Sequence, residues 1–189
     1  MKQSESDYIL FLDSDNKILP AYIDIGIQQL ESNSKAAVVY GNANFINDTA
    51  KRSFTTDSFD IKRILIENYI DTCSVVRKKA WESVDGMDEE RLLIGHEDWE
   101  FWIHLYTVGW ELVYINQTLF EYRVASTSLI TKTTKNDFYV KLEYIHKKHW
   151  KILYDTYLYL YGRELTYQAD VKRPIRSFFK YIQQGFIKT

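Results

Sequence analysis

The first run of apolar positions along the chain ends in a pair of acids. Five apolar residues, Tyr8 to Leu12, are followed directly by Asp13-Ser14-Asp15. A short, uninterrupted apolar run is typical of a strand that is buried on both faces in a parallel sheet. Ligands of open α/β sheets bind beyond the carboxyl ends of such strands. The pattern therefore predicts a buried parallel strand that presents two carboxylates at a ligand-binding edge.

Helical and extended patterns then alternate as far as residue 124. Apolar residues at helical spacing, as at Ile23, Ile27 and Leu30, indicate helices, and runs such as Ala36 to Tyr40 indicate strands. This alternation predicts an α/β fold. We expect helices over 20–31, 60–67, 78–84 and 97–109, and strands over 36–40, 42–46, 73–77, 110–115 and 119–124.

The remaining residues have a helical pattern and a different charge. Apolar positions from Phe138 to Tyr159 recur at spacings of four and three, which predicts a stripe that packs inward, and a second helix is expected over 174–187. Residues 1–131 carry 12 Lys and Arg against 21 Asp and Glu, whereas 132–189 carry 12 against 5. We therefore expect an acidic α/β part over 1–131 and a basic helical extension over 132–189.

Composition restricts the class of protein. Apolar residues make up 46% of the chain and charged residues 26%, which is typical of a globular protein and excludes a disordered one. The single cysteine, Cys73, excludes an internal disulfide and fits a reducing compartment. No apolar stretch approaches the length of a membrane span, and no signal-peptide pattern opens the chain, so we expect a cytoplasmic location.

Two acidic groups carry the candidate chemistry. Asp13 and Asp15 could hold a divalent cation with phosphate oxygens, because hard cations prefer oxygen ligands, although Asp is also common in turns. Glu97 and Asp98 open a predicted helix, where the helix dipole stabilises carboxylates. Three acids within four positions exceed what a helix start needs, so a carboxylate here could act as a general base. His149 is expected to be structural, because lysines surround it.

Taken in order, these segments resemble family 2 glycosyltransferases of the GT-A fold. The resemblance covers roughly residues 7–130, and its most specific part is Gly-Met-Asp-Glu followed some ten residues later by Glu-Asp-Trp. The matching segments are Asp13-Ser14-Asp15, Tyr40-Gly41, Ser74-Val75-Val76-Arg77, Gly86-Met87-Asp88-Glu89, Glu97-Asp98-Trp99 and Tyr122-Arg123.

The resemblance implies a partial GT-A mixed sheet flanked by helices, and inverting sugar transfer from a nucleotide-diphospho-sugar. Asp15 would ligate Mn²⁺ or Mg²⁺, and Asp13 would contact the ribose or a metal-bound water. Asp98 would be the catalytic base, with Glu97 beside it near the acceptor. Ser14, His96, Trp99 and Arg123 complete the expected donor- and acceptor-binding residues.

The resemblance also implies partners. The acceptor would be a saccharide or a lipid-linked sugar of bacterial surface polysaccharide or glycolipid synthesis. Because such acceptors are often anchored to the inner leaflet, the basic extension could contact anionic lipid at the inner membrane face. A solvated helix face that balances the acidic part is the alternative. No nucleic-acid binding is expected, because the aromatic residues of the extension fall at helical core spacing.

The sequence departs from the family pattern in two ways. Family members begin with a strand–helix–strand unit that binds base and ribose, whereas this sequence begins at the strand before Asp13, so we expect the C-terminal part of an enzyme. The exposed edge left by that unit would favour oligomers. Many relatives also have a histidine shortly after the Tyr-Arg pair, where this chain has Val124-Ala125-Ser126.

Two other functions stay open. The first is a binding or assembly module that has the fold without turnover, which the absent nucleotide-binding unit favours. The second is a phosphatase of the haloacid-dehalogenase type, which also has a strand ending in Asp-x-Asp. That family requires Gly-Thr after the second acid, where this chain has Asn16-Lys17.

Overall fold

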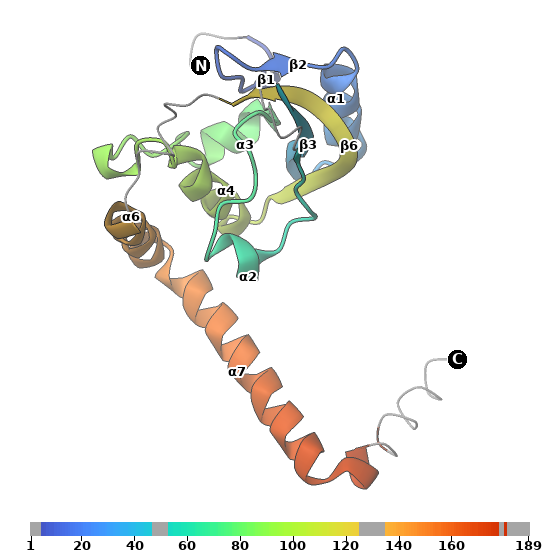
Figure 1. The fold of residues 1–189 in the computed structure, drawn as a ribbon, viewed down its shortest axis with the longest axis vertical. Coiled ribbons are helices and arrows are strands. Elements are labelled where there is room, and N and C mark those ends of the chain that lie inside the picture. The colour runs from blue at the N-terminus through green and yellow to red at the C-terminus, as the bar shows by residue number, and fades with distance from the viewer. Residues whose placement is uncertain (1–4, 47–52, 125–134, 178–179, 181–189) are drawn as a thin grey trace. The chain divides into compact units, whose positions relative to one another are not determined.

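The computed structural model describes residues 5–46, 53–124, 135–177 and 180 (Figure 1). Contacts between residues divide the chain into two compact units, 1–149 and 150–189. The boundary expected between residues 131 and 132 lies outside the described residues.

Among the described residues of the first unit, six strands form one mixed sheet. Its strand order is β1-β5-β3-β6-β2, and β4 pairs with β3. The pair β3 and β6 is parallel, and every other pair is antiparallel. The strands are β1 (Tyr8–Leu10), β2 (Lys17–Ile18), β3 (Ala36–Ile46), β4 (Ser53–Phe54), β5 (Val75–Arg77) and β6 (Glu111–Arg123).

The two central strands are longer than the pattern predicted. Each was expected as two short strands, yet β3 and β6 run unbroken, and shifts in their pairing register fall at Gly41–Asn42 and Asn42–Ala43. A Cβ on Gly41 would lie 2.6 Å from Leu119 Cδ1 and 2.8 Å from Ile115 O, so only glycine fits there. The glycine and its polar neighbours therefore mark an irregularity within a strand instead of a turn between strands.

The prediction of a buried parallel strand before the acids was wrong. β1 pairs antiparallel with β5 at one end of the strand order, and its residues are half-buried. Leu12, the last residue of the apolar run, lies beyond the strand and is 43% exposed. A short apolar run indicates a strand but holds no information on the direction of the partner. The acids nevertheless follow this strand closely, after Phe11 and Leu12.

The helices of the first unit occur near the expected positions. They are α1 (Tyr22–Ser32), α2 (Ile61–Ile64), α3 (Lys78–Ser83), the 3₁₀ helix η1 (Arg91–Leu93), α4 (Glu97–Thr107) and α6 (Lys135–Lys148). Asp60 caps α2 as predicted, with its side chain accepting from Lys62 N–H, but α2 ends after one turn. The buried face of α1 is Tyr22, Gly26 and Leu30, whereas the predicted Ile23 is exposed.

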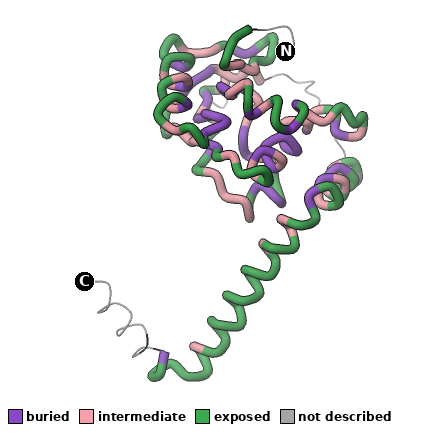
Figure 2. Tube along the Cα trace, turned by 180° about the vertical axis from the view of Figure 1, so that it is seen from behind, coloured by how far each residue is buried: buried purple, intermediate pink, exposed green. Residues whose placement is uncertain are grey.

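The core lies between the sheet and its helices. On one side Tyr22 and Leu30 of α1 pack with Val39 and Phe120 of the central strands. Tyr22 also donates a hydrogen bond to Cys73 O at 2.7 Å, which ties α1 to the segment before β5. Figure 2 shows the buried residues concentrated in this unit. The aromatic helix α4 contributes five buried apolar residues to the core, namely Trp99, Phe101, Trp102, Ile103 and Leu105.

In the second unit, α7 (Trp150–Lys172) has no buried residue. The predicted inward stripe therefore holds for Ile145 and His149, which are buried, and fails for Tyr159, which is 57% exposed (Figure 2). Apolar residues occur all around α7, as in the run 157–161, so they define no single packing face. No described helix is long and apolar enough to cross a membrane. The helix expected over 174–187 lies mostly outside the described residues.

Candidate functional site

The Asp13-Ser14-Asp15 segment forms an exposed turn between β1 and β2. Buried Asn16 holds the turn in shape: its backbone N–H donates to Asp13 O at 3.1 Å, and its side-chain oxygen accepts from Arg123 N–H at 2.9 Å. Arg123 Nε donates to Asp15 O at 3.1 Å. The two acids and the cationic Arg123 are thus fixed beside one another. Sequence reasoning missed Asn16, whose only signal is a polar residue within a turn.

Asp98 lies at the start of α4, and both of its carboxylate oxygens have a partner. Oδ1 accepts from Trp99 N–H at 2.8 Å, and Oδ2 accepts from Asn68 Nδ2 at 3.1 Å. Burial, and then the negative charge of Asp71, raise the pKa of Asp98 to about 7. A carboxyl group with a pKa near the working pH is well suited to accept a proton during catalysis.

Asp71 is a third acid at this place that the sequence analysis did not single out. Burial raises its pKa to about 6, although a hydrogen bond from Cys73 N–H to Asp71 Oδ1, at 2.8 Å, acts in the opposite direction. The charge of Asp13 raises the pKa of Asp71, as the charge of Asp71 raises that of Asp98. Three acids from three separated segments therefore share one electrostatic environment.

Tyr122 on β6 experiences the charges of the same acids, apart from Asp98. Burial raises the pKa of its phenol, and the charges of Asp71, Asp13 and Asp15 raise it further. The ring packs against Phe45, with 5.5 Å between centroids. Tyr122 therefore lies among the acids of the turn and Asp71, in the same short segment as Arg123.

The other predicted residues near Asp98 make contacts within the protein. Glu97 accepts from Gly95 N–H at 2.8 Å. His96 is buried with its Nδ1 3.0 Å from Lys141 Nζ, and burial followed by that cation lowers its pKa. Trp99 is fully buried and donates to Ile64 O at 2.6 Å. Any effect of Trp99 on an acceptor is therefore indirect, and roles of Glu97, His96 and Ser14 in substrate binding stay predictions.

The two acids at the turn could ligate a cation that is also coordinated by substrate phosphates, but they are too few to coordinate a cation by themselves. Burial and the neighbouring Asp15 raise the pKa of Asp13, which is the sign of two like charges close together. In the described part of the chain, no group of three or more His, Cys, Asp and Glu side chains could hold a metal ion. Mg²⁺ is commonly held by one or two carboxylates together with substrate phosphates, so two carboxylates suffice for that mode.

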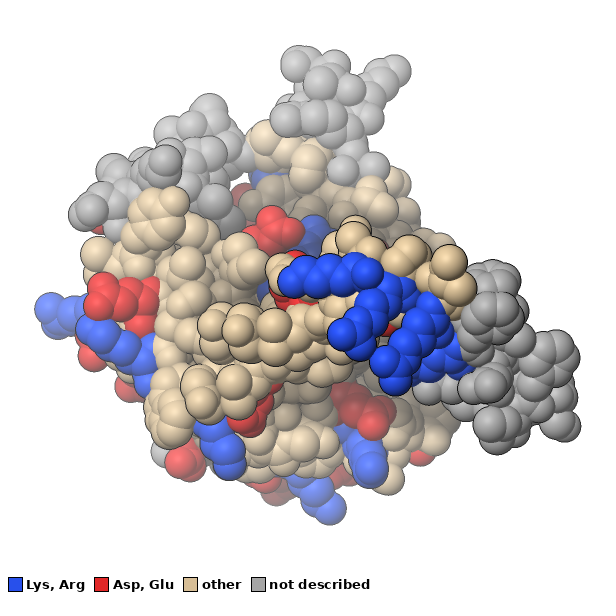
Figure 3. Space-filling view, turned by 90° about the horizontal axis from the view of Figure 1, so that it is seen from below, with Lys and Arg blue, Asp and Glu red and all other residues tan. Residues whose placement is uncertain are grey.

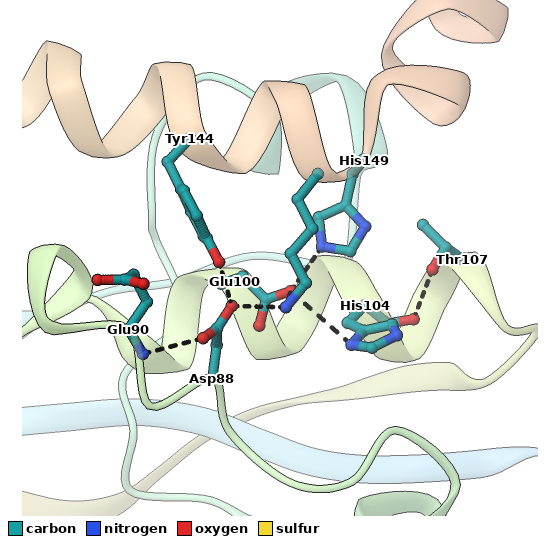
Figure 4. Close-up of polar contacts among 8 residues, drawn as sticks. Asp88, Glu90, Glu100, His104, Thr107, Tyr144 and His149 are labelled. Carbon is teal, nitrogen blue, oxygen red and sulfur yellow. Dashed lines mark hydrogen bonds and ion pairs between the residues drawn. The ribbon is translucent and has the colours of Figure 1, made fainter.

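A second polar cluster joins α4 to α6 (Figure 4). Glu100 is fully buried, and its Oε1 accepts from His149 Nε2 at 2.6 Å and from Lys148 Nζ at 2.9 Å. Lys148 also pairs with Asp88 Oδ2 at 2.6 Å, and Tyr144 donates to the same oxygen at 2.8 Å. His149, which was expected to be structural, is therefore hydrogen-bonded to the buried Glu100. Glu100, the third acid of its sequence cluster, faces away from solvent into this network.

Comparison with known proteins identifies the fold. No protein-family model and no curated protein sequence matches the chain. Among solved structures, S. aureus TarS 1–349 in complex with UDP-GlcNAc is similar with a TM-score of 0.57 and 16% identity, over 76% of this chain and 43% of TarS. TarS 1–349 alone and with UDP each give a TM-score of 0.54 and 18% identity, over 76% of this chain and 41% of theirs.

The likeness confirms the predicted fold class. The chain has part of a GT-A-like glycosyltransferase fold, a mixed sheet flanked by helices. It spans less than half the length of the TarS chains that it matches. At 16–18% identity the likeness concerns the fold alone, so the chemistry must be argued from this chain's own residues.

Proposed function

We propose that this chain is part of an inverting glycosyltransferase that moves a sugar from a nucleotide-diphospho-sugar to an acceptor hydroxyl. What supports the proposal is the electrostatic link from Asp13 to Asp71 and from Asp71 to Asp98, which joins three separated segments of a GT-A-like fold. Packing alone gives no reason to gather acids, because like charges repel and buried charges are costly. A TarS structure with the same fold holds UDP-GlcNAc.

Asp98 has the properties of the general base in this reaction. Its carboxylate accepts the proton of the acceptor hydroxyl while that oxygen bonds to the anomeric carbon of the sugar. The bond from that carbon to the diphosphate breaks, and its electron pair leaves with the diphosphate. Because the hydroxyl attacks from the opposite face, the anomeric configuration inverts. The pKa of Asp98, about 7, leaves a large ionised fraction at neutral pH.

The turn is where the diphosphate would bind. Asp15, with Asp13 beside it, would hold Mn²⁺ or Mg²⁺ together with diphosphate oxygens. Bound there, the cation supplies Lewis-acid stabilisation of the charge that develops on the leaving group. Arg123 adds a fixed positive charge, because its Nε is hydrogen-bonded to Asp15 O.

Turnover of sugar nucleotides by the full-length protein tests the proposal. We expect release of nucleoside diphosphate from at least one member of a panel of nucleotide-diphospho-sugars, UDP-GlcNAc included, and loss of that release when EDTA removes divalent cations. Saturable binding of the donor without release, in the presence of sugar and glycolipid acceptors, would support the binding or assembly module instead. If the protein binds none of the donors and releases no nucleoside diphosphate, both the transferase and the binding module are contradicted.

We further propose that α7 contacts an anionic lipid surface. At the end of this helix and just after it, Lys172, Arg173 and Arg176 are exposed. Figure 3 shows a group of Lys and Arg side chains gathered on the face seen from below. Exposed tyrosines and leucines occupy the preceding turns, among them Tyr154, Tyr157, Leu158, Leu160 and Tyr161. Basic groups and tyrosine rings are both attracted to the headgroup region of anionic membranes.

Co-sedimentation with vesicles tests this contact. Because each Lys or Arg near an anionic surface contributes about 1 kcal/mol, we expect binding to phosphatidylglycerol vesicles that fades with added salt. Replacing Lys172, Arg173 and Arg176 together by Gln should weaken the binding. Equal sedimentation with anionic and neutral vesicles at low salt would contradict the proposal and favour a solvated helix face.

A further inference from the structure

The orientation of Asp98 depends on a residue from a distant part of the chain. One of its oxygens accepts from the N–H of Trp99, its neighbour in sequence, at 2.8 Å. The other accepts from the side-chain amide of Asn68 at 3.1 Å, and Asn68 comes from the segment between α2 and β5. Among the described residues, these are the two groups that donate hydrogen bonds to the Asp98 carboxylate.

The amide of Asn68 is itself fixed. Its oxygen accepts from Ile70 N–H at 3.3 Å, which leaves its NH₂ group to point at Asp98. The residues on either side are anchored as well: Thr56 Oγ1 donates to Tyr69 O at 2.7 Å, and Leu65 O lies 2.7 Å from His146 Nε2. A fixed donor loses little freedom when it bonds, so it can hold a carboxylate in one orientation.

The same segment reaches the Asp-x-Asp turn. Six residues after Asn68 in the chain, Ser74 O accepts from Phe11 N–H at 3.1 Å, and Phe11 lies shortly before Asp13. Between Asn68 and Ser74, the Asp71 carboxylate accepts a hydrogen bond from Cys73 N–H. Residues 68–74 therefore form one connection, with Asp98 bonded at one end and the strand that leads to the turn bonded at the other.

We propose that Asn68 is a positioning residue, whose side-chain amide holds the Asp98 carboxylate in the orientation in which it accepts the proton of the acceptor hydroxyl. This inference rests on the function proposed above. It assigns the amide of Asn68 to Asp98, to which it donates, and to Ile70 N–H, from which it accepts, and not to substrate. Asn68 belongs to none of the sequence motifs.

The charges around Asp98 determine the expected effect of losing the amide. Asp71, from the segment before β5, and Glu97, on α4 itself, are the described ionisable groups that act on Asp98, and both favour its protonated form. The Asn68 hydrogen bond favours the ionised form. Without this bond, the pKa of Asp98 should rise, and a smaller fraction of the enzyme should hold an ionised base at neutral pH.

Two variants of Asn68 and one matched control test the inference. Asn68→Ala removes the donor, and Asn68→Asp keeps the shape while replacing the donor by a further acid. Asn33→Ala is the control: Asn33 also accepts from the N–H two residues later, at 3.0 Å, and donates to a carboxylate, Glu111, at 2.8 Å, but lies at the end of α1. The same kind of bond is thus lost away from Asp98.

The first measurement needs no turnover. NMR titration of ¹³C-labelled aspartate carboxyl groups, with Asp98 assigned through Asp98→Asn, should show its pKa raised by about one unit in Asn68→Ala, by more in Asn68→Asp, and unchanged in Asn33→Ala. An Asp98 pKa that is the same in the unaltered protein and in either folded Asn68 variant would overturn the inference.

The second measurement is the pH dependence of turnover. The half-point of the rise in kcat/KM with pH should move upward with the Asp98 pKa, which lowers kcat/KM about fivefold at pH 7 for a one-unit shift, with donor binding unchanged. An unmoved half-point would overturn the catalytic part of the inference. If the unaltered protein turns over no sugar nucleotide, the proposed function fails instead, and the titration alone decides whether Asn68 holds Asp98.

Discussion

Replacing Asp98 by Asn in the full-length enzyme is expected to lower kcat by at least about 10²-fold, because an amide cannot accept the proton of the acceptor hydroxyl. Asn is close to Asp in size, and it can keep the hydrogen bond from Trp99 N–H with its oxygen. Binding of the donor should therefore stay nearly unchanged. Turnover with saturating donor, and donor affinity by calorimetry, are the two measurements.

The same substitution should make the protein more stable. Because the pKa of Asp98 is raised when the protein folds, the folded state binds this proton more tightly than the unfolded state. Asp98 therefore contributes a free energy of unfolding that falls as the pH rises from about 4 to about 7. Asp98→Asn removes this fall, so urea unfolding at pH 8 should show a gain in stability relative to the unaltered protein.

The two results together separate a base from a structural acid. A structural acid would lose stability when replaced, and turnover would fall only with the folded fraction. Retention of more than a tenth of the turnover by the well-folded variant would exclude Asp98 as the base. Asp15→Asn is the comparison at the turn. In the presence of a divalent cation, this variant should lose donor binding as well as turnover, because Asp15 is the proposed metal ligand.

Local signals were enough to predict much of this architecture. The apolar spacing in α4, the stop at Gly109 and the cap at Asp60 are all encoded within a few residues of the elements that they define. The order of segments, with acids after the first strand and a Glu-Asp pair at a helix start, carries the family resemblance that implied the fold class. These features depend on residues close by in the sequence, so they can be interpreted without knowing which distant segments pack against them.

What sequence reasoning missed depends on partners far away in the chain. Asn68 and Asp71 have no pattern of their own, and they matter because Asp98 and Asp13 fold against them. The antiparallel pairing of β1 is likewise set by β5, which comes much later. Trp99 was expected at a substrate surface, yet its ring is buried and stacks on Phe138 of α6.

Glu100 shows how little an acid's role can be inferred from its neighbours in sequence. It lies two residues after Asp98, yet successive positions on a helix point in different directions, so Glu100 faces α6 while Asp98 faces Asn68. Burial opposes the ionised form of Glu100, but the hydrogen bonds of His149 and Lys148 lower its pKa overall. An ionised carboxylate in the core depends on those two partners.

Replacing Glu100 by Gln is expected to lower the free energy of unfolding by about 1.5–3 kcal/mol, since the hydrogen bonds of Lys148 and His149 to a buried carboxylate become bonds to a neutral amide. Lys148 would retain Asp88, and His149 would face a neutral amide oxygen in place of the carboxylate. The matched control is Glu143→Gln, because Glu143 pairs with Lys147 at 2.6 Å on the exposed surface of the same α6. That exposed pair should contribute far less.

The pH dependence gives this prediction a second, independent test. Because the pKa of Glu100 is lowered on folding, its contribution is fully present above the ordinary glutamate pKa and is lost as the pH falls through the folded value. The difference between Glu100→Gln and the unaltered protein, measured by urea unfolding, should therefore be largest near neutral pH and shrink below about pH 4. This is opposite to the effect of Asp98, whose ionisation destabilises the fold. A difference that does not change with pH would contradict an ionised Glu100 and leave only lost packing to explain it.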